Sequence, residues 1–450
     1  MPAIAYLNRL LPGLQPLLKY RAEDWPHDFS AGLSVAAVSI PVAIAYAEVA
    51  GLSPSAGLYS SILPMIVYAL AGTSRQMIIG PDAATCAMIA AVVAPLAAGN
   101  SGVYLSFSIA LTLLTGIFCI AASFLRLGGL ADFLARPILV GLLNGISLSI
   151  MVGQVGKVLG SKGQASRFFR QILEIPELVL QAHVPTVLLS LGCVLVMSVM
   201  PRLSKRIPAS LVTMILAALA AYSLRLDEMG VALIGPVASG LPTLEWPELQ
   251  LHEVGDLAGS AAGLGLVLFT SGMLTARSFA ERNRYDIDVD REFAAFGMAN
   301  IVSALSQGFA VTGSSSRTAV NDANGGRTQM VSIIAAVAIA LLLLAGTASL
   351  AWLPIPALGV VLIFASWSLL DLQVFRRYHQ VERAALLLGA VTMLGVLAFG
   401  AIKAIMLAVT LALLMFVRRV ARPALEELVV VDGRSGLYNR LLFPDATPIG

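Results

Sequence analysis

The chain has 450 residues, of which 58% are hydrophobic and only 12% are charged. Because a soluble domain carries roughly 25% charged residues, this composition excludes an ordinary soluble domain and indicates an integral protein of the lipid bilayer. A helix that spans a bilayer needs about 20 apolar residues, so the chain can form well over ten spans. The net charge of +3 is small, and we expect no nucleic-acid partner.

The residue types that bind metals and cofactors are few and scattered. Cys86, Cys119 and Cys193 all lie in apolar runs, which argues against a disulfide framework or a thiolate metal site. The four histidines show no ligand spacing, and no HExxH or GxSxG motif is present. We therefore expect no cofactor, no metal and no enzymatic activity.

The N-terminal segment, residues 1–28, is mixed in character and lacks the central apolar block of a cleavable signal. Leu7, Leu10, Leu11 and Leu14 recur at helical spacing, which predicts a helix that lies at the membrane interface. This segment leads into the first spanning helix.

Fourteen apolar segments follow, and a longer connection, 225–256, divides them into two sets of seven. An odd number per set inverts the second set relative to the first, so we assign 29–224 and 257–419 to two inverted repeats. The expected segments lie near 30–50, 56–72, 80–98, 103–125, 131–159, 184–200 and 208–224, and near 257–279, 291–306, 314–326, 328–348, 354–370, 383–397 and 400–417.

The third segment of the second set begins in a polar stretch, QGFAVTGSSSRTAVNDANGGRTQ, at 307–329. Residues 309–312 are typical of a short extended piece, and Gly313 breaks it. Ser314, Ser315 and Ser316 can then cap a helix whose N-terminus points back at the break. Because a helix N-terminus carries partial positive charge and free N–H groups, and Arg317 adds a full charge, this end suits an anion.

The third segment of the first set begins in a similar way. Residues 76–85 give a short apolar run, then Gly80, Pro81 and a helix start. Paired segments interrupted by Gly and Pro in two halves of a chain indicate a transporter built on an inverted repeat, with two half-helices facing each other across a solute. The alternative is that each stretch is an ordinary loop followed by an ordinary helix.

Positive charge gathers on alternate connections. If the N-terminus is cytoplasmic, the cytoplasmic loops contain Arg75, Arg126, Arg277, Arg327 and Arg376, whereas most opposite loops are small and neutral. The exceptions are 157–170 and 225–256, but the bias is strong enough to set the orientation. We expect both termini in the cytoplasm and the protein in a bacterial inner (plasma) membrane.

The character of the chain changes after the last span. Residues 420–450 look like a soluble segment that contains strands, but some 30 residues are too few for a domain. We therefore expect a cytoplasmic tail that is only the beginning of a further region.

Several stretches together resemble the sulfate permease (SulP) family of anion transporters over about residues 25–420. They are IPVAIAYA at 40–47 with AGLSP at 50–54 and GLYSS at 57–61, GTSR at 72–75 with Gly80 and Pro81, LADFLARPILVGLLNGISLSIMVGQ at 130–154, ARSFA at 276–280, and VTGS at 311–314 with RTAVN at 317–321.

The resemblance implies an all-α polytopic membrane protein with fourteen segments in a seven-plus-seven inverted repeat of the uracil-permease type. It implies a core domain that carries the substrate against a gate domain, two half-helices preceded by short extended strands, and a homodimer. Family members usually end in a cytoplasmic STAS domain, and the tail at 420–450 resembles only its lead-in.

Three positions depart from the family pattern. Val42 stands where many members carry Gln, and Ser271 stands where many carry a carboxylate linked to cation or proton coupling. Conversely, Asp82 adds a carboxylate at the start of the third segment, where the family often has an apolar or small residue.

The helix-end argument and the resemblance together give a set of candidate substrate-binding residues. Arg317 is expected to attract the anion; the alternatives are a structural salt bridge or a side chain that reaches the surface. Asp82 is the candidate for ion coupling, although the helix dipole alone also favours an aspartate there. The full set is Tyr46, Asp82, Ala83, Ala84, Thr85, Ser271, Gly313, Ser314, Ser315, Ser316 and Arg317.

These features favour a secondary transporter that moves a small inorganic or carboxylate anion by alternating access, with a proton or sodium as the co-transported ion. The first alternative is an uncoupled anion exchanger or channel on the same scaffold. The second is a nucleobase permease, which the serine at position 271 disfavours.

Overall fold

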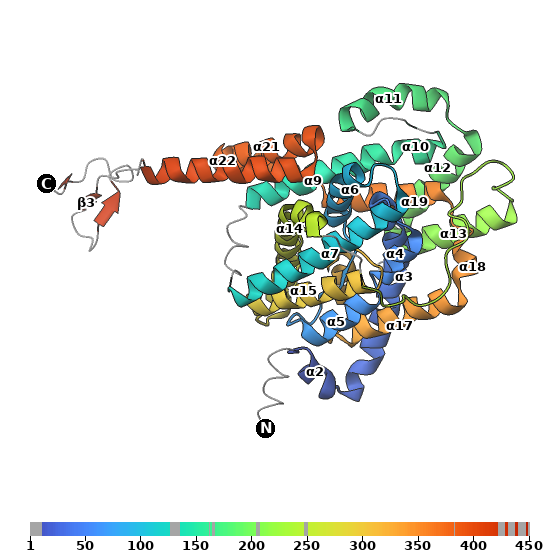
Figure 1. The fold of residues 1–450 in the computed structure, drawn as a ribbon, viewed down its shortest axis with the longest axis horizontal. Helices are drawn as coiled ribbons and strands as arrows, with labels where there is room; N and C mark the ends of the chain where they lie inside the picture. Colours follow the sequence, from blue (N-terminus) through green and yellow to red (C-terminus); the bar gives the residue numbers. More distant parts are fainter. Residues whose placement is uncertain are drawn as a thin grey trace.

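The computed structural model describes residues 11–126, 136–161, 163, 167–203, 208–246, 251–381 and 383–421, and three short strands at 428–430, 437–439 and 447–448. The expected interfacial positions Leu7 and Leu10 lie outside the described residues. Within them the chain is mostly helical (Figure 1).

The first seven spans follow a short helix α2 (Leu14–Leu18) and a 3-10 turn η1 (Ala22–Asp24). In chain order they are α3 (Trp25–Val49), α4 with α5 (Pro54–Tyr59 and Leu63–Ala71), β1 with α6 (Ile79–Gly80 and Ala83–Ala97), α7 (Ser101–Phe124), α9 with α10 (Arg136–Gly153 and Val155–Leu159), α12 (Val184–Leu203) and α13 (Ala209–Ser223).

The second seven repeat this order. They are α14 (Leu251–Asn283), α15 (Val289–Leu305), β2 with α16 (Thr312–Gly313 and Ser315–Ala323), α17 (Met330–Ala345), α19 (Ile355–Leu369), α21 (Arg383–Phe399) and α22 (Ala401–Ala421), with a short turn α18 (Thr347–Leu350) after α17. Among the described residues the predicted segment bounds hold to within a few residues, except that α14 begins at Leu251 and not near residue 257. The predicted start of the fifth segment, at 131–135, lies outside the described residues.

Two helices were not predicted from the sequence. α11 (Phe168–Leu180) and α20 (Gln373–Val381) each lie between the fifth and sixth spans of their series. α11 leaves Phe169, Leu173 and Leu180 exposed along one side, as an amphipathic helix at a membrane interface does. Their matching positions add a further element to the repeat.

Length and composition identify seven helices among the described residues that can cross a membrane unaided, and five shorter apolar helices accompany them. α6 is one of the shorter set, at 15 residues, and α16 has only 9. Both are therefore half-helices, and each is completed by the extended strand before it.

The helices pack into two bodies. α3 to α7 contact α14 to α17, whereas α9 to α13 contact α19 to α22, and α3 meets α19 and α13 where the bodies join (Figure 1). Small residues permit close crossings within the first body: a Cβ added to Gly116 of α7 would lie 2.8 Å from the carbonyl oxygen of Gly297 in α15. Such contacts replace the hydrophobic driving force that lipid surroundings remove.

The two half-helices meet through their strands. β1 pairs antiparallel with β2, so that Ile79 lies opposite Gly313 and Gly80 opposite Thr312. The Ser314 N–H continues the ladder to the carbonyl oxygen of Ile78 at 2.9 Å. The expected apposition of the N-termini of α6 and α16 is confirmed, and the alternative of two independent loops is wrong.

The C-terminal tail contains three strands, β3 (Leu428–Val430), β4 (Leu437–Asn439) and β5 (Thr447–Pro448). They form one sheet in the order β4-β3-β5. This agrees with the strand-containing segment expected from the sequence after residue 420.

Candidate functional site

The N-terminus of α16 is open to a ligand. Ser314 caps the helix: its hydroxyl oxygen lies 3.5 Å from the Arg317 nitrogen, and its carbonyl accepts the Thr318 N–H at 2.9 Å. The N–H groups of Ser315 and Ser316 have no acceptor among the described residues, and both side chains are exposed. Two backbone donors therefore lack an acceptor at this exposed end, and the two hydroxyls each contact a neighbouring hydroxyl.

Arg317 lies directly behind this open end and is fully buried. One terminal nitrogen donates to the carbonyl oxygen of Pro81, whereas Nε and Nη1 have no hydrogen-bond acceptor. The guanidinium fits because position 80 is glycine: a Cβ there would lie 2.6 Å from Nη1. A buried cation with unused donors is costly, which is the state expected of a site that an anion completes.

The alternatives considered for Arg317 do not fit its geometry. The side chain forms no ion pair with Asp82 or with any other carboxylate among the described residues. It is also not exposed, so it does not reach the membrane surface. Its charge is held inside the protein, beside the two strands.

The N-terminus of α6 differs because it supplies its own anion. The Asp82 carboxylate accepts the Ala84 N–H at 3.2 Å, and the Thr85 hydroxyl donates to the Asp82 carbonyl oxygen at 2.9 Å. Ala83, Ala84 and Thr85 are buried, whereas Asp82 is partly exposed. The predicted residues are therefore gathered here, but a carboxylate already occupies helix donors that a substrate could use.

Tyr46 lies near both helix ends. It lies in α3 and is 5% exposed, and its phenol is within electrostatic range of both Asp82 and Arg317. The structure thus brings together three polar groups from three spans that are far apart in the sequence.

Ser271 belongs to a helix that packs directly on β2. A Cβ added to Gly313 would lie 3.0 Å from the Cα of Gly272. One turn after Ser271, the Thr275 hydroxyl lies 2.7 Å from the Ser315 hydroxyl. Sequence reasoning missed Thr275, although residues four apart on a helix share a face, so the position of Ser271 could have indicated it.

A second residue that sequence reasoning missed holds the chain before β1. Glu292 of α15 is fully buried. Its carboxylate accepts the Thr73 N–H and hydroxyl, both at 2.6 Å, and the Tyr68 hydroxyl at 2.8 Å. The only signal in the sequence is a carboxylate just inside an apolar helix.

Two half-helices that meet end to end within two series of spanning helices define a membrane transporter rather than an enzyme. Comparison with known proteins makes the class specific. Residues 26–392 match the model of the sulfate permease family, and the chain belongs to this family.

Curated relatives cover nearly the whole chain. A probable sulfate transporter of Mycobacterium tuberculosis is 39% identical over 435 residues, which are 97% of this chain and 78% of that protein. The low affinity sulfate transporter 3 of Stylosanthes hamata is 31% identical over 451 residues, covering 95% of this chain and 69% of its own.

Solved structures share the fold. The structure of SLC26A9 matches with a TM-score of 0.90 at 20% identity, covering 100% of this chain and 74% of that one. The transmembrane domain of the cyanobacterial bicarbonate transporter BicA matches with a TM-score of 0.75 at 22% identity, covering 87% and 98%. The predicted fold of fourteen segments in a seven-plus-seven inverted repeat is thereby confirmed.

Proposed function

We propose that the chain is a secondary active transporter of small anions of the sulfate, bicarbonate or dicarboxylate class. The observation that carries the proposal is the buried guanidinium of Arg317, with two nitrogens lacking an acceptor, behind the open N-terminus of α16. Its relatives are named as sulfate transporters, and SLC26A9 is named as an anion transporter. A nucleobase permease does not account for a buried positive charge at this position.

The anion lies between the two half-helices, closer to α16 than to α6. The N–H groups and hydroxyls of Ser315 and Ser316 donate to its oxygens, and Arg317 balances its charge from behind. Because Thr275 contacts the Ser315 hydroxyl, α14 orients this donor. Hydroxyl and amide donors suit an oxyanion of any of the proposed classes.

Asp82 is the group that could couple transport to protons. When ionised, it repels an incoming anion and occupies donors at the N-terminus of α6. When it takes up a proton together with the anion, the repulsion is removed and the two move as symport. The competing arrangement is that Asp82 stays ionised and only tunes affinity through its attraction to Arg317.

The replacement of the family's usual carboxylate by Ser271 favours a second candidate function, uncoupled exchange or a channel. Uptake of labelled sulfate, bicarbonate and dicarboxylates into proteoliposomes, with and without imposed proton or sodium gradients, separates the two. We expect an inward proton gradient to stimulate uptake. Stimulation by neither gradient favours the uncoupled alternative, and uptake of none of the anions contradicts the proposed function.

The variant Asp82→Asn tests the coupling step, since asparagine resembles the protonated carboxyl. We expect the variant to keep anion binding and to lose the stimulation by a proton gradient. Glu228→Gln is the matched control, because it neutralises an exposed carboxylate that lies outside the anion site. Stimulation that survives in Asp82→Asn rules out Asp82 as the coupling group.

Alternating access requires the two bodies to move relative to each other, with the site carried by the body of α3 to α7 and α14 to α17. Glu48 at the end of α3 and Lys157 of α10 form an ion pair at 2.7 Å across the boundary. The Glu48–Lys157 ion pair is therefore one of the contacts that this motion must break.

The positive-inside pattern supports an orientation with both termini in the cytoplasm of a bacterial inner membrane. The exposed apolar side chains of α12 and α13 face lipid or a second copy of the chain in the proposed homodimer.

A further inference from the structure

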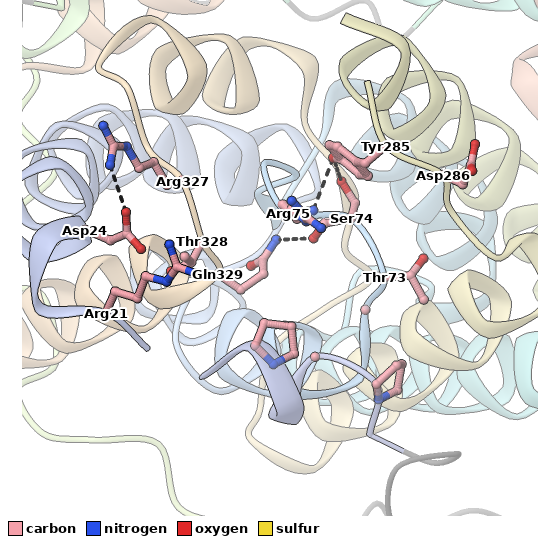
Figure 2. Close-up of a pocket in the computed structure, with 14 residues that line it drawn as sticks. Arg21, Asp24, Thr73, Ser74, Arg75, Tyr285, Asp286, Arg327, Thr328 and Gln329 are labelled. Atoms are coloured by element: carbon pink, nitrogen blue, oxygen red, sulfur yellow. Dashed lines mark hydrogen bonds and ion pairs between the residues drawn. The ribbon is translucent and has the colours of Figure 1, made fainter. Parts of the chain in front are cut away.

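A pocket lies apart from the anion site, at the end of the molecule where the chain enters α3 (Figure 2). Its volume is about 610 Å³, and none of the candidate substrate-binding residues lines it. It is bordered by residues 12–24, the loop before β1, the loop after α14 and the loop after α16. This size is within the range of pockets for small organic ligands.

The lining is positively charged. Three arginines, Arg21, Arg75 and Arg327, line it together with two carboxylates, Asp24 and Asp286. Arg327 is paired with Asp24 at 2.9 Å. Among the described residues, neither Arg21 nor Arg75 pairs with a carboxylate, and the Arg75 guanidinium lies 5.3 Å from the centre of the Tyr285 ring. Two guanidinium groups therefore remain available to an anionic ligand.

Three neutral polar side chains of the pocket are already engaged. The Thr73 hydroxyl donates to Glu292 at 2.6 Å, and the Thr328 hydroxyl donates to Asp28 at 2.6 Å. The Gln329 amide donates to the carbonyl oxygens of Ser74 and Met77. Recognition therefore falls to the arginines, whose planar forks bind phosphate and carboxylate with two parallel hydrogen bonds.

An exposed apolar stripe begins directly beside the pocket. Trp25, Phe29 and Leu33 recur every four residues along α3 and are 49%, 47% and 54% exposed. The rings of Trp25 and Phe29 stack at 5.6 Å. Because tryptophan is enriched where a membrane meets water, Trp25 indicates that the pocket lies at the level of lipid head groups and the stripe at the level of acyl chains.

We propose that this pocket binds the phosphate head group of an anionic phospholipid, whose acyl chains lie along the stripe of Trp25, Phe29 and Leu33. Arg21 and Arg75 contact the phosphate, as basic pockets at the cytoplasmic ends of spanning helices do. The charge complementarity and the adjacent apolar stripe distinguish a lipid from a soluble phosphate, which needs only the first of these features.

The bound lipid would stabilise the anion site from behind. The loops around the pocket lead into β1 and out of α16, the two elements that hold the site. A head group that bridges Arg21 of the N-terminal segment and Arg75 of the loop before β1 joins them through the ligand. The inference depends on the membrane setting of the fold and not on which anion is transported.

The test uses the purified full chain and a short-chain phosphatidylglycerol as the probe, with phosphatidylcholine and glycerol phosphate for comparison. Native mass spectrometry measures binding, and thermal unfolding measures stabilisation. We expect phosphatidylglycerol to bind and stabilise the protein more than phosphatidylcholine does. Arg21→Gln/Arg75→Gln should weaken its binding about 10-fold or more, because hydrogen bonds to charged groups contribute about 1.5–3 kcal/mol each.

The matched control is Arg225→Gln/Arg284→Gln, which removes the same charge from two exposed arginines outside the pocket. Unchanged lipid binding in the pocket variant, or an equal loss in the control, overturns the proposal. If glycerol phosphate binds as tightly as the lipid does, the ligand of the pocket is a soluble phosphate ester, and the proposal is overturned as well.

If the double variant does not fold, Arg21→Gln decides the question, since the Arg21 side chain makes no hydrogen bond or ion pair with the described residues. This single change should weaken binding about 3-fold or more, and full retention contradicts the proposal.

Discussion

The chain before β1 and the chain before β2 have the same role in the two repeats, but they are held by different chemistry. Before β1, the Thr73 and Ser74 N–H groups donate to Glu292 at 2.6 and 3.1 Å, and the Asn321 amide donates to the Gln76 carbonyl oxygen at 2.7 Å. All of these partners come from the second repeat, and the central one is a carboxylate.

Before β2, the partners are neutral and mostly local. The Val311 N–H donates to the Asn300 side-chain oxygen at 2.9 Å, and the Asn300 amide donates back to the Val311 carbonyl oxygen at 3.0 Å. The Ser303 hydroxyl donates to the Phe309 carbonyl oxygen at 2.6 Å. Ser60, which accepts the Phe309 N–H at 2.8 Å, comes from the first repeat, whereas Asn300 and Ser303 belong to the second.

The two half-helices that follow these segments also differ in the charge of the groups at their N-termini. α6 starts with a carboxylate, Asp82, that satisfies its own helix end, whereas α16 starts with free donors and the buried cation of Arg317. A repeated backbone therefore does not give two equivalent half-sites. The fold supplies the apposition of the helix ends, and side chains on one end supply the attraction for an anion.

The largest expected effect concerns Arg317 at the N-terminus of α16. Arg317→Ala should lower anion uptake about 100-fold, because hydrogen bonds to a charged group contribute up to about 3 kcal/mol. Arg317→Lys should restore uptake only in part, since lysine lacks the planar fork. Uptake in proteoliposomes measures both, with the exposed Arg284→Ala as control. Normal substrate binding by purified Arg317→Ala shows that the residue is structural.

A smaller effect separates the two lead-in segments. Glu292→Gln loses charge-assisted bonds and places an amide donor beside the Thr73 N–H, so we expect a loss of about 2–3 kcal/mol in stability. Asn300→Ala, which removes the neutral counterpart, should cost about 1–2 kcal/mol. Thermal unfolding in detergent compares them. An equal or larger loss in Asn300→Ala contradicts the view that the carboxylate dominates.

Much of this architecture could be predicted from the sequence because it depends on local signals. Apolar runs indicate the spans, and a glycine before a capping residue indicates each half-helix, at Gly80 and at Gly313. Glu292 could not be assigned in this way, since its partner Thr73 lies 219 residues away and only the folded chain brings them together.

The short helices α11 and α20 were missed for a related reason. Their polar faces interrupt the apolar runs by which spans are recognised, so a search for spans passes over them. The burial of Arg317 could not be predicted either. An arginine that reaches the membrane surface and one that lies buried behind the strands give the same signal in the sequence. The steric limit at Gly80 that admits the guanidinium appears only in three dimensions.

The smallest expected effect concerns the contact that ties α14 to the open helix end. The hydroxyls of Thr275 and Ser315 are 2.7 Å apart, and Thr275 is 3% exposed. Thr275→Val keeps the shape and removes this bond, so we expect the apparent affinity for the anion to fall about 3- to 5-fold, equivalent to roughly 1 kcal/mol for a neutral hydrogen bond. Uptake measured over a range of anion concentrations gives this value.

A double-mutant cycle with Ser315→Ala distinguishes orientation from simple loss of polarity. If Thr275 acts by orienting the Ser315 hydroxyl, Thr275→Val should add little to the effect of Ser315→Ala, because the bond is already absent. Thr270→Val is the matched control, since the Thr270 hydroxyl bonds to its own helix at the Leu266 carbonyl oxygen. Additive losses in the double variant contradict this role, and the N-terminus of α16 then orients its donors without help from α14.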